Sequence, residues 1–283
     1  MVRLNRSIWT VLAVSCLVGA GVVALLVAGR EMPWEGRTSQ ADPARAESAP
    51  LLGQAVAGES AHARPEDPKF ARMRARMVEE DLRGPGREIK DAKVLEVMGR
   101  IPRQEFVPEG LRNRAYADHP LPIGHDQTIS QPYIVALMTQ LVEPGAESRA
   151  LDVGTGSGYQ AAVLAEISKE VYSIEIVKPL AEDAEKRLKD LGYKNITVRH
   201  GDGYRGWEEK APFDVIIVAA APDHVPQPLV DQLAPGGKMV IPVGRYYQQL
   251  LVIERDKEGN VHRRPNIPVM FVPMTGEAQR RRE

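Results

Sequence analysis

The sequence predicts an α/β domain built on a doubly wound, mostly parallel sheet and preceded by an apolar N-terminal segment. Three observations predict this class. An apolar stretch runs into a glycine-rich turn at residues 151–159 and on into an alanine-rich run at residues 161–167, which is the order of a strand, a tight turn and a helix. The unbroken apolar run at residues 213–218 is typical of a parallel strand covered on both faces. Elsewhere in this region short apolar strands alternate with amphipathic helices.

Composition restricts the classes of function. The chain has 283 residues, of which 43% are hydrophobic, and a formal net charge of -1, which suits one catalytic domain with extensions. Proteins that depend on nucleic-acid phosphates usually carry a clear basic excess, so we expect no nucleic-acid partner. The single cysteine, Cys16, allows no intrachain disulfide and no cysteine-based metal site, and we expect no bound metal.

The N-terminal region predicts an anchor and a tether. Residues 8–28 form an apolar run of membrane-spanning length, so we expect residues 1–31 to be an uncleaved anchor, with a signal segment as the alternative. Residues 32–68 are rich in Ala, Pro, Ser and Gly and predict a disordered tether. The folded domain is expected over residues 69–275, and residues 276–283 form a charged tail.

Two amphipathic helices are predicted at the start of the folded domain. Residues 70–82 place Met and Val at helical spacing, and the Gly-Pro-Gly sequence at residues 84–86 ends this helix. Asp91 is placed to cap a second short helix whose apolar residues lie between positions 94 and 98.

A proline-punctuated extended stretch follows at residues 116–132 and leads into a helix over residues 133–141. Ser130 stands where the N-cap of this helix is expected, with Gln131 and Pro132 in the first turn, so helix capping is one explanation of this serine.

The glycine turn predicts a nucleotide-like ligand. Glycines allow positive φ and let a ligand lie against the main chain, while the amide end of the next helix faces that ligand. A dinucleotide fingerprint requires a small residue where this chain has Tyr159, and the last glycine, Gly158, comes one residue too early. The order Asp-x-Gly-x-Gly-x-Gly, which begins at Asp152, instead resembles the cofactor loop of S-adenosylmethionine methyltransferases. A purely structural turn is the alternative.

A strand over residues 171–176 is predicted to end near Glu175, about twenty residues after Gly154, a spacing that suits a carboxylate accepting both ribose hydroxyls. A surface glutamate at a strand end is the alternative. The remaining elements are predicted as a helix from residue 178 to the glycine at 192, strands at 196–198 and 213–218, a helix at 225–233, a strand at 239–243, and antiparallel strands at 250–254 and 269–272 around a turn at 256–260.

Several segments together resemble the protein-L-isoaspartate O-methyltransferase family. The matching segments are residues 103–108, 116–118, 121–124, 127–132, 199–203, 211–214, 233–237 and 242–244, within a region of resemblance that covers residues 77–273. The resemblance implies the fold of the S-adenosylmethionine methyltransferases, S-adenosyl-L-methionine as cofactor, and methyl transfer to the carboxylate of L-isoaspartyl residues in damaged proteins. By the same resemblance, the methyl ester closes to a succinimide and so begins repair.

The resemblance also implies the site residues. Ser130 would act as the catalytic residue by holding the substrate carboxylate, and Asp202 would contact the adenine, with a turn-forming Asp-Gly as the alternative for the latter. The implied substrate-binding residues are Thr128, Ile129, Gln131 and Pro132. The implied cofactor-binding residues are Asp152, Gly154, Thr155, Gly156, Ser157, Gly158, Glu175, Asp202 and Gly203. An isoaspartyl carboxylate is ionised at neutral pH, so no general base is required.

The chain departs from the family pattern at two positions, where Asp126 replaces the usual glycine and Ala219 a common threonine. We expect Asp126 to face solvent; the alternative is that it repels an anionic substrate. Residues 219–222 lack the polar, proline and aromatic side chains that hold a flipped base, which argues against base methylation.

Two other functions stay open: a methyltransferase for another carboxylate or a small molecule, and an inactive membrane-tethered binding protein. We expect a monomer whose catalytic domain is cytoplasmic and anchored through residues 8–28, with the cell envelope or periplasm as the alternative location.

Overall fold

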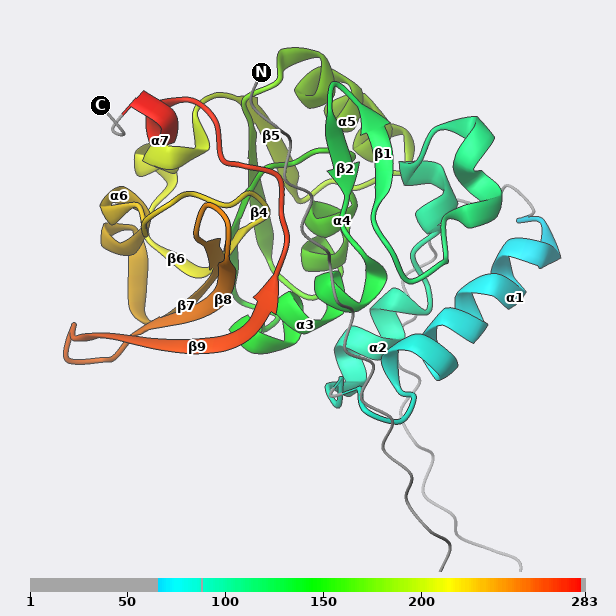
Figure 1. Cartoon of the computed structure of the whole chain (residues 1–283), viewed down its shortest axis with the longest axis horizontal. Coiled ribbons are helices and arrows are strands. Elements are labelled where there is room, and N and C mark those ends of the chain that lie inside the picture. The colour runs from blue at the N-terminus through cyan, green and yellow to red at the C-terminus, as the bar shows by residue number, and fades with distance from the viewer. Residues whose placement is uncertain (1–65, 88, 281–283) are drawn as a thin grey trace, which may run out of the picture. The chain divides into compact units, whose positions relative to one another are not determined.

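The computed structural model describes residues 66–87 and 89–280. In that part of the chain a seven-stranded sheet has the order β5-β4-β3-β6-β7-β8-β9, and a separate two-stranded sheet pairs β1 with β2 (Figure 1). The strands are β1 (Leu121–Gly124), β2 (Gln127–Ile129), β3 (Arg149–Val153), β4 (Glu170–Glu175), β5 (Ile196–His200), β6 (Phe213–Val218), β7 (Leu233–Val243), β8 (Gln248–Arg255) and β9 (Val261–Val269). Strands β3, β4, β5, β6 and β7 are parallel, while β8 and β9 are antiparallel additions. The predicted mostly parallel sheet is confirmed.

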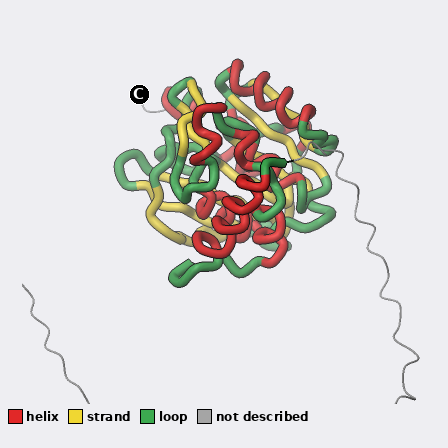
Figure 2. Tube along the Cα trace, turned by 90° about the vertical axis from the view of Figure 1, so that its right-hand side faces the viewer, coloured by secondary structure: helices red, strands yellow, loops and turns green. Residues whose placement is uncertain are grey.

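Helices pack on both faces of this sheet. The α-helices are α1 (Pro68–Arg76) with a π-helical continuation (Met77–Leu82), α2 (Ala92–Met98), α3 (Pro132–Val142), α4 (Tyr159–Ala165), α5 (Lys178–Asp190), α6 (Gln227–Asp231) and α7 (Glu277–Arg280). Short 3-10 turns are η2 (Arg103–Phe106), η3 (Glu109–Arg114), η4 (Gly203–Arg205) and η5 (Glu208–Lys210). In Figure 2, which looks from the side of α1 and α2, helices lie in front of the strands.

Alternating residues of the central strands enter two separate cores. On β6, Val215 and Ile217 pack with residues of α2, α3 and α4, whereas Ile216 and Val218 pack with residues of α6 and α7. Successive side chains of a strand point to opposite faces, so an unbroken apolar run is the pattern expected for a strand that is buried twice.

Two of the predicted elements have clearly different bounds in the structure. Helix α6 covers only Gln227–Asp231 because the chain already joins β7 at Leu233. The last strand was wrongly predicted at residues 269–272, since β9 spans Val261–Val269. Strand β9 is an edge strand that contains exposed charged residues and two prolines. An edge strand tolerates such residues, but they remove the apolar alternation by which a strand is predicted from sequence.

The predicted N-terminal helix and its capped neighbour are both present. Asp91 caps α2 by accepting hydrogen bonds from the amides of Lys93 and Val94 at 2.8 and 3.2 Å. Helix α1 starts at Pro68 after the N-cap Asp67. The expected anchor and signal region, residues 1–31, and the expected tether up to residue 65 lie outside the described residues. Within the described part of the chain, no helix has the length and hydropathy needed to cross a membrane.

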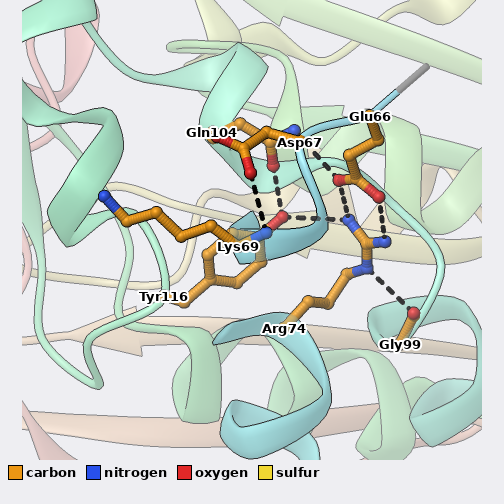
Figure 3. A network of polar contacts seen from close by, with 7 residues as sticks. All are labelled: Glu66, Asp67, Lys69, Arg74, Gly99, Gln104 and Tyr116. Atoms are coloured by element: carbon orange, nitrogen blue, oxygen red, sulfur yellow. Dashed lines mark hydrogen bonds and ion pairs between the residues drawn. The ribbon is translucent and has the colours of Figure 1, made fainter. Parts of the chain in front are cut away.

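The start of the folded region is fastened by a polar network around Arg74 (Figure 3). The guanidinium of Arg74 pairs with both carboxylate oxygens of Glu66 at 2.6 and 2.7 Å and donates to the carbonyl of Gly99 at 2.9 Å. It also donates to the hydroxyl of Tyr116 at 3.1 Å, and that hydroxyl donates to Gln104. Paired, largely buried arginines hold their partners in fixed geometry. Residues 66 and 67 therefore belong to the folded domain.

Candidate active site

The glycine turn after β3 adopts the backbone that the sequence predicts. Gly154, Gly156 and Gly158 have φ values of 94°, 52° and 90°, a region that only glycine enters without strain. The amide of Gly154 donates to the carbonyl of Ile174 at 2.8 Å, which ties the turn to the end of β4. A Cβ at Gly156 would lie 3.3 Å from Cδ1 of Ile123, so a side chain there would narrow the space in front of the turn.

Tyr159, which argued against a dinucleotide site, is a core residue. It is 1% exposed, and its ring meets that of Phe106 edge-on at 5.3 Å between centroids. The bulky side chain thus packs between the sheet and the helices that precede it, and it replaces the small residue that a dinucleotide fold requires at this point.

A pocket opens at the carboxyl ends of the parallel strands, beside the glycine turn. Its walls come from five parts of the chain: residues 127–130, residues 153–160 without Gly158, and residues 174–177, 219–220 and 272–275, with Gly203 and Val135 completing it. Ligands of open α/β sheets bind outside the carboxyl ends of the strands. The pocket therefore lies where this class of fold places its ligand.

Glu175 ends β4 with its carboxylate at the pocket wall. It is 5% exposed, and Oε2 accepts the amide of Gly156 at 2.8 Å while Oε1 accepts the amide of Val177 at 2.9 Å. Each carboxylate oxygen has a second lone pair, so the group remains able to accept two ligand hydroxyls. The same contacts hold the glycine turn and the carboxylate in one fixed arrangement.

A buried polar chain lies beneath the glycine turn. The hydroxyls of Thr155 and Ser173 lie 2.5 Å apart, and Ser173 donates to Oδ2 of Asp152 at 2.7 Å. Among the described residues Oδ1 of Asp152 has no hydrogen-bond partner. Burial, followed in smaller measure by the repulsion of Glu175, raises the pKa of Asp152 to about 7, against the lowering effect of Ser173. Asp152 supports the turn and does not line the pocket.

Asp202 holds the chain on the far side of the pocket. Its Oδ1 accepts the amide of Tyr204 at 3.0 Å, and its Oδ2 accepts the amide of Glu277 at 2.7 Å. The residue caps the short turn η4 and fastens the C-terminal segment, while its neighbour Gly203 lines the pocket and Asp202 does not. The turn-forming explanation therefore accounts for the contacts that are seen.

Ser130 lines the pocket but does not cap α3, so the capping interpretation was wrong. The N-cap residue is Gln131, and it makes no side-chain cap hydrogen bond. The first turn is instead satisfied by Asp118, whose Oδ1 accepts the amide of Tyr133 at 3.0 Å and whose Oδ2 accepts from the side chain of Gln131 at 2.8 Å. Because the carboxylate of Asp118 accepts the amide at the start of α3, the hydroxyl of Ser130 is available to a ligand in the pocket.

Arg103, which the sequence analysis did not single out as a site residue, lies behind Ser130. The side chain is 0% exposed, and it donates to the carbonyls of Ala115 and Ser130 at 2.7 Å each. Its guanidinium lies 4.6 Å from the centre of the Tyr159 ring, and its Nη1 has no hydrogen-bond partner among the described residues. Burial lowers the pKa of Arg103. A positive charge thus lies directly behind the serine.

Of the expected substrate residues, Thr128 and Ile129 line the pocket, whereas Gln131 and Pro132 do not. The loop between β1 and β2 turns at His125 and Asp126, which have φ values of 52° and 56°. Asp126 is exposed, as expected. A glycine suits this backbone better than an aspartate, although aspartate enters the left-handed region more readily than most residues.

The expected cofactor residues of the turn, Gly154 to Gly158, are mostly in the pocket wall. The members that line it are Gly154, Thr155, Gly156 and Ser157. Gly158 is the N-cap of α4, where a Cβ would lie 3.2 Å from Leu188. Ala219 also lines the pocket, and its Cβ would lie 3.6 Å from a Cβ placed on Gly154. The small side chain at this departure from the family pattern leaves the turn unobstructed.

The wall formed by residues 272–275 had no sequence signal. These residues follow β9, and backbone hydrogen bonds of 2.9 Å join Val272 and Met274 to the two sides of Ala221. Strand β6 and the glycine turn can be predicted from local sequence patterns, but this wall is made by a contact between segments far apart in the chain. Its backbone pairing identifies it only once the fold is known.

Comparisons with known proteins point to one family. A family model described as Protein-L-isoaspartate(D-aspartate) O-methyltransferase (PCMT) matches residues 74–279. A Syntrophobacter fumaroxidans protein named Protein-L-isoaspartate O-methyltransferase 2 is 54% identical over 235 residues, which are 80% of this chain and 94% of that protein. A Polaromonas protein of the same name is 55% identical over 205 residues, 71% of this chain and 96% of its own.

Solved structures agree with this result. A structure titled as a protein-L-isoaspartate O-methyltransferase matches with a TM-score of 0.65 at 28% identity, over 74% of this chain and 69% of its own. A protein from Plasmodium falciparum, titled as a putative protein-L-isoaspartate O-methyltransferase in complex with S-adenosyl-L-homocysteine, matches with a TM-score of 0.61 at 31% identity. That match covers 71% of this chain and 98% of the other.

Proposed function

Because this chain belongs to the protein-L-isoaspartate O-methyltransferase family, we propose that its pocket holds the methyl donor against the Gly154 turn and the acceptor carboxylate against Ser130. The protein transfers a methyl group from S-adenosyl-L-methionine to the carboxylate of L-isoaspartyl residues in damaged proteins. The methyl ester closes to a succinimide, and repair begins there.

The residues of the donor side fit an adenosyl ligand. Glu175 keeps one lone pair on each carboxylate oxygen for the ribose hydroxyls, since its two protein contacts use the others. The absence of side chains at Gly154 and Gly156 leaves room for a ligand to lie against the main chain, and a Cβ at Gly156 would take up part of that room. When bound, S-adenosyl-L-methionine supplies an electrophilic methyl group on its sulfonium.

The acceptor side holds an anion. The hydroxyl of Ser130 donates to the substrate carboxylate, and Thr128 and Ile129 form the adjoining wall of the pocket. Arg103 keeps Ser130 in place through the 2.7 Å bond to its carbonyl. Its charge, buried in a medium of low dielectric, also favours a carboxylate over a neutral group at this position. Arg103 is a positioning residue in this proposal, because it acts through Ser130.

Positioning supplies the acceleration, because the acceptor is already ionised at neutral pH and needs no base. Holding the two reactants in a near-attack geometry is worth on the order of 7 to 11 kcal/mol. The observation that carries this proposal is the meeting of the Glu175 carboxylate and the Ser130 loop in one pocket at the carboxyl ends of β3, β4 and β6.

The test is the Ser130→Ala variant, assayed with an isoaspartyl peptide. A hydrogen bond to a charged group is worth roughly 1.5 to 3 kcal/mol, so kcat/KM falls about 10- to 150-fold. Ser148→Ala is the matched control, because Ser148 precedes β3 at the amino end of the strand, away from the pocket, and its hydroxyl accepts the amide of Gly145 in its own turn. Methylation by the Ser130 variant at the rate of the unaltered enzyme would remove this serine from the reaction.

We further propose that the catalytic domain works as a monomer in the cytoplasm, where its methyl donor is made. Residues 8–28 would anchor it to the membrane. Their apolar length supports the anchor. Deleting residues 1–31 should move the protein from the membrane fraction to the soluble fraction of the cell. An unchanged distribution would contradict the anchor.

A further inference from the structure

Three large side chains with apolar surface stand almost free of the protein beside the pocket. Tyr246, Tyr247 and Met270 are 81%, 95% and 92% exposed. Within the described residues the other large hydrophobic side chain that is exposed is Val261, at 39%. Tyrosine and methionine are enriched where proteins bind other polypeptides, since each offers a large apolar surface and tyrosine adds a hydrogen-bonding group. Grouped exposure of this kind marks a binding surface more often than chance.

The three residues lie on two segments that are bonded to each other. Tyr246 and Tyr247 occupy the turn between β7 and β8, and Met270 follows β9 directly. Gln248 joins the two segments through its side chain: Nε2 donates to the carbonyl of Phe271 at 3.0 Å, and Oε1 accepts the backbone amide of Phe271 at 2.6 Å. The turn and Met270 therefore lie side by side at one edge of the sheet.

This edge is continuous with the rim of the pocket. The amide of Gly244, at the start of the turn, donates to the carbonyl of Pro222 at 2.9 Å, two residues after the pocket residue Ala220. On the other segment, Val272 lines the pocket and is two residues beyond Met270. In Figure 1 the chain leaves β9 and runs past the ends of the strands toward α7. A polypeptide that leaves the pocket in this direction meets the tyrosines and the methionine.

The backbone of the turn that carries the tyrosines is constrained. Gly244 has a φ of 131°, and a Cβ at this residue would lie 2.1 Å from the carbonyl oxygen of Tyr247, so only glycine permits the turn to close. The guanidinium of Arg245 lies 5.3 Å from the centre of the Tyr246 ring. A backbone that is already ordered loses less entropy when a partner binds.

We propose that Tyr246, Tyr247 and Met270 form a docking surface for the substrate polypeptide, which favours a bulky apolar or aromatic residue within a few positions of the isoaspartyl residue. The inference rests on the proposed function, in which the acceptor carboxylate enters at Ser130. The reacting residue is part of a chain, and an extended chain advances about 3.3 to 3.6 Å per residue. The flanking residues must therefore lie on the rim, and among the described residues this surface exposes the largest apolar side chains beside the pocket.

The experiment compares two sets of isoaspartyl octapeptides, one with leucine or phenylalanine at the positions flanking the isoaspartyl residue and one with alanine there. Separate peptides carry the bulky residues before and after the isoaspartyl position. The full chain and a variant with Tyr246→Ser, Tyr247→Ser and Met270→Ser are assayed for kcat/KM on each peptide. Val261→Ser is the matched control, since it removes an exposed apolar side chain at the opposite end of β9.

The unaltered enzyme should prefer the bulky-flanked peptides on one side by about tenfold, the usual scale for losing aromatic contacts at an interface. The triple variant should bring that ratio to near one, and Val261→Ser should keep it. A ratio that survives in the triple variant overturns the proposal, as does an equal fall on both sets of peptides. If the triple substitution abolishes a concentration-dependent self-association in sedimentation and leaves the ratio unchanged, the surface binds a second copy instead. Inactivity of the unaltered enzyme on every isoaspartyl peptide would refute the proposed function itself, whereas activity without preference refutes the docking surface alone.

Discussion

Replacing Glu175 by glutamine tests the donor half of the pocket with a single atom. The carboxylate accepts two backbone amides, from Gly156 at 2.8 Å and from Val177 at 2.9 Å. In Glu175→Gln one of the two acceptor oxygens becomes an NH₂ group, which cannot accept from an amide. Whichever way the side-chain amide turns, one of these contacts becomes a donor facing a donor.

The loss divides into a stability effect and a binding effect. The lost backbone contact is present with and without ligand, so it lowers the free energy of unfolding by about 1.5 to 3 kcal/mol, the worth of a hydrogen bond to a charged group. The lost acceptor for a ribose hydroxyl matters only in the complex. It removes a similar amount from binding, which weakens the affinity about 10- to 150-fold.

The assay is calorimetric titration with S-adenosyl-L-homocysteine, which has no methyl group to transfer, together with urea unfolding. Glu170→Gln is the matched control, because Glu170 begins the same strand and accepts from the hydroxyl of Tyr172 at 2.9 Å, away from the pocket. The control should bind with an affinity within about twofold of the unaltered protein, since exposed contacts are worth little. If Glu175→Gln binds as tightly as the control, Glu175 does not hold the donor.

Three other substitutions test the supports of the pocket. Arg103→Lys keeps the charge but loses one of the two hydrogen bonds to buried carbonyls, so the free energy of unfolding falls by about 1 to 3 kcal/mol. In this variant kcat/KM for an isoaspartyl peptide should fall more than the affinity for S-adenosyl-L-homocysteine. An equal fall in both would contradict a role at Ser130. In Gly203→Ala the new Cβ meets Cγ1 of Val153 at 2.4 Å, so overpacking costs about 1 to 3 kcal/mol and calorimetry should show weaker donor binding. Asp152 has a pKa of about 7 in the folded protein, above its ordinary value of 3.8. As the pH rises from 4 to 7, the carboxyl group of Asp152 therefore loses its proton in the unfolded chain before it does so in the folded protein. The folded state loses stability over that pH range. Asp152→Asn does not titrate, so its stability relative to the unaltered protein should rise between pH 4 and pH 7 in urea unfolding, and a constant difference would contradict the raised pKa.

The sequence predicted the glycine turn and its flanking strands well because their signals are local. Three glycines within five residues determine the turn, and the apolar runs before and after it determine β3 and β4. Glu175 then follows from the length of one βαβ unit. Each of these inferences needs only the residues next to it in the chain.

The acceptor half was less accessible to sequence reasoning. Ser130 looked like a helix cap, and only the fold shows that Asp118, fifteen residues before Tyr133, satisfies that helix. The same holds for β9, whose prolines and charges are permitted by its place at the sheet edge. The wall after β9 depends on pairing with Ala221, some fifty residues away in the chain. Contacts of this length have no local pattern.

The two halves of the pocket therefore differ in what can disturb them. The donor turn is held by contacts to the end of β4, from the carbonyl of Ile174 and the carboxylate of Glu175. Ser130 depends on Arg103, which the structure records as fully buried and bonded to Ala115 as well, and on Asp118, which also pairs with Arg87 at 2.8 Å. All of these partners lie before β1 in the chain. The segment that precedes β1 thus positions the proposed acceptor site, because Arg103 bonds to Ser130 and Asp118 bonds to the first turn of α3.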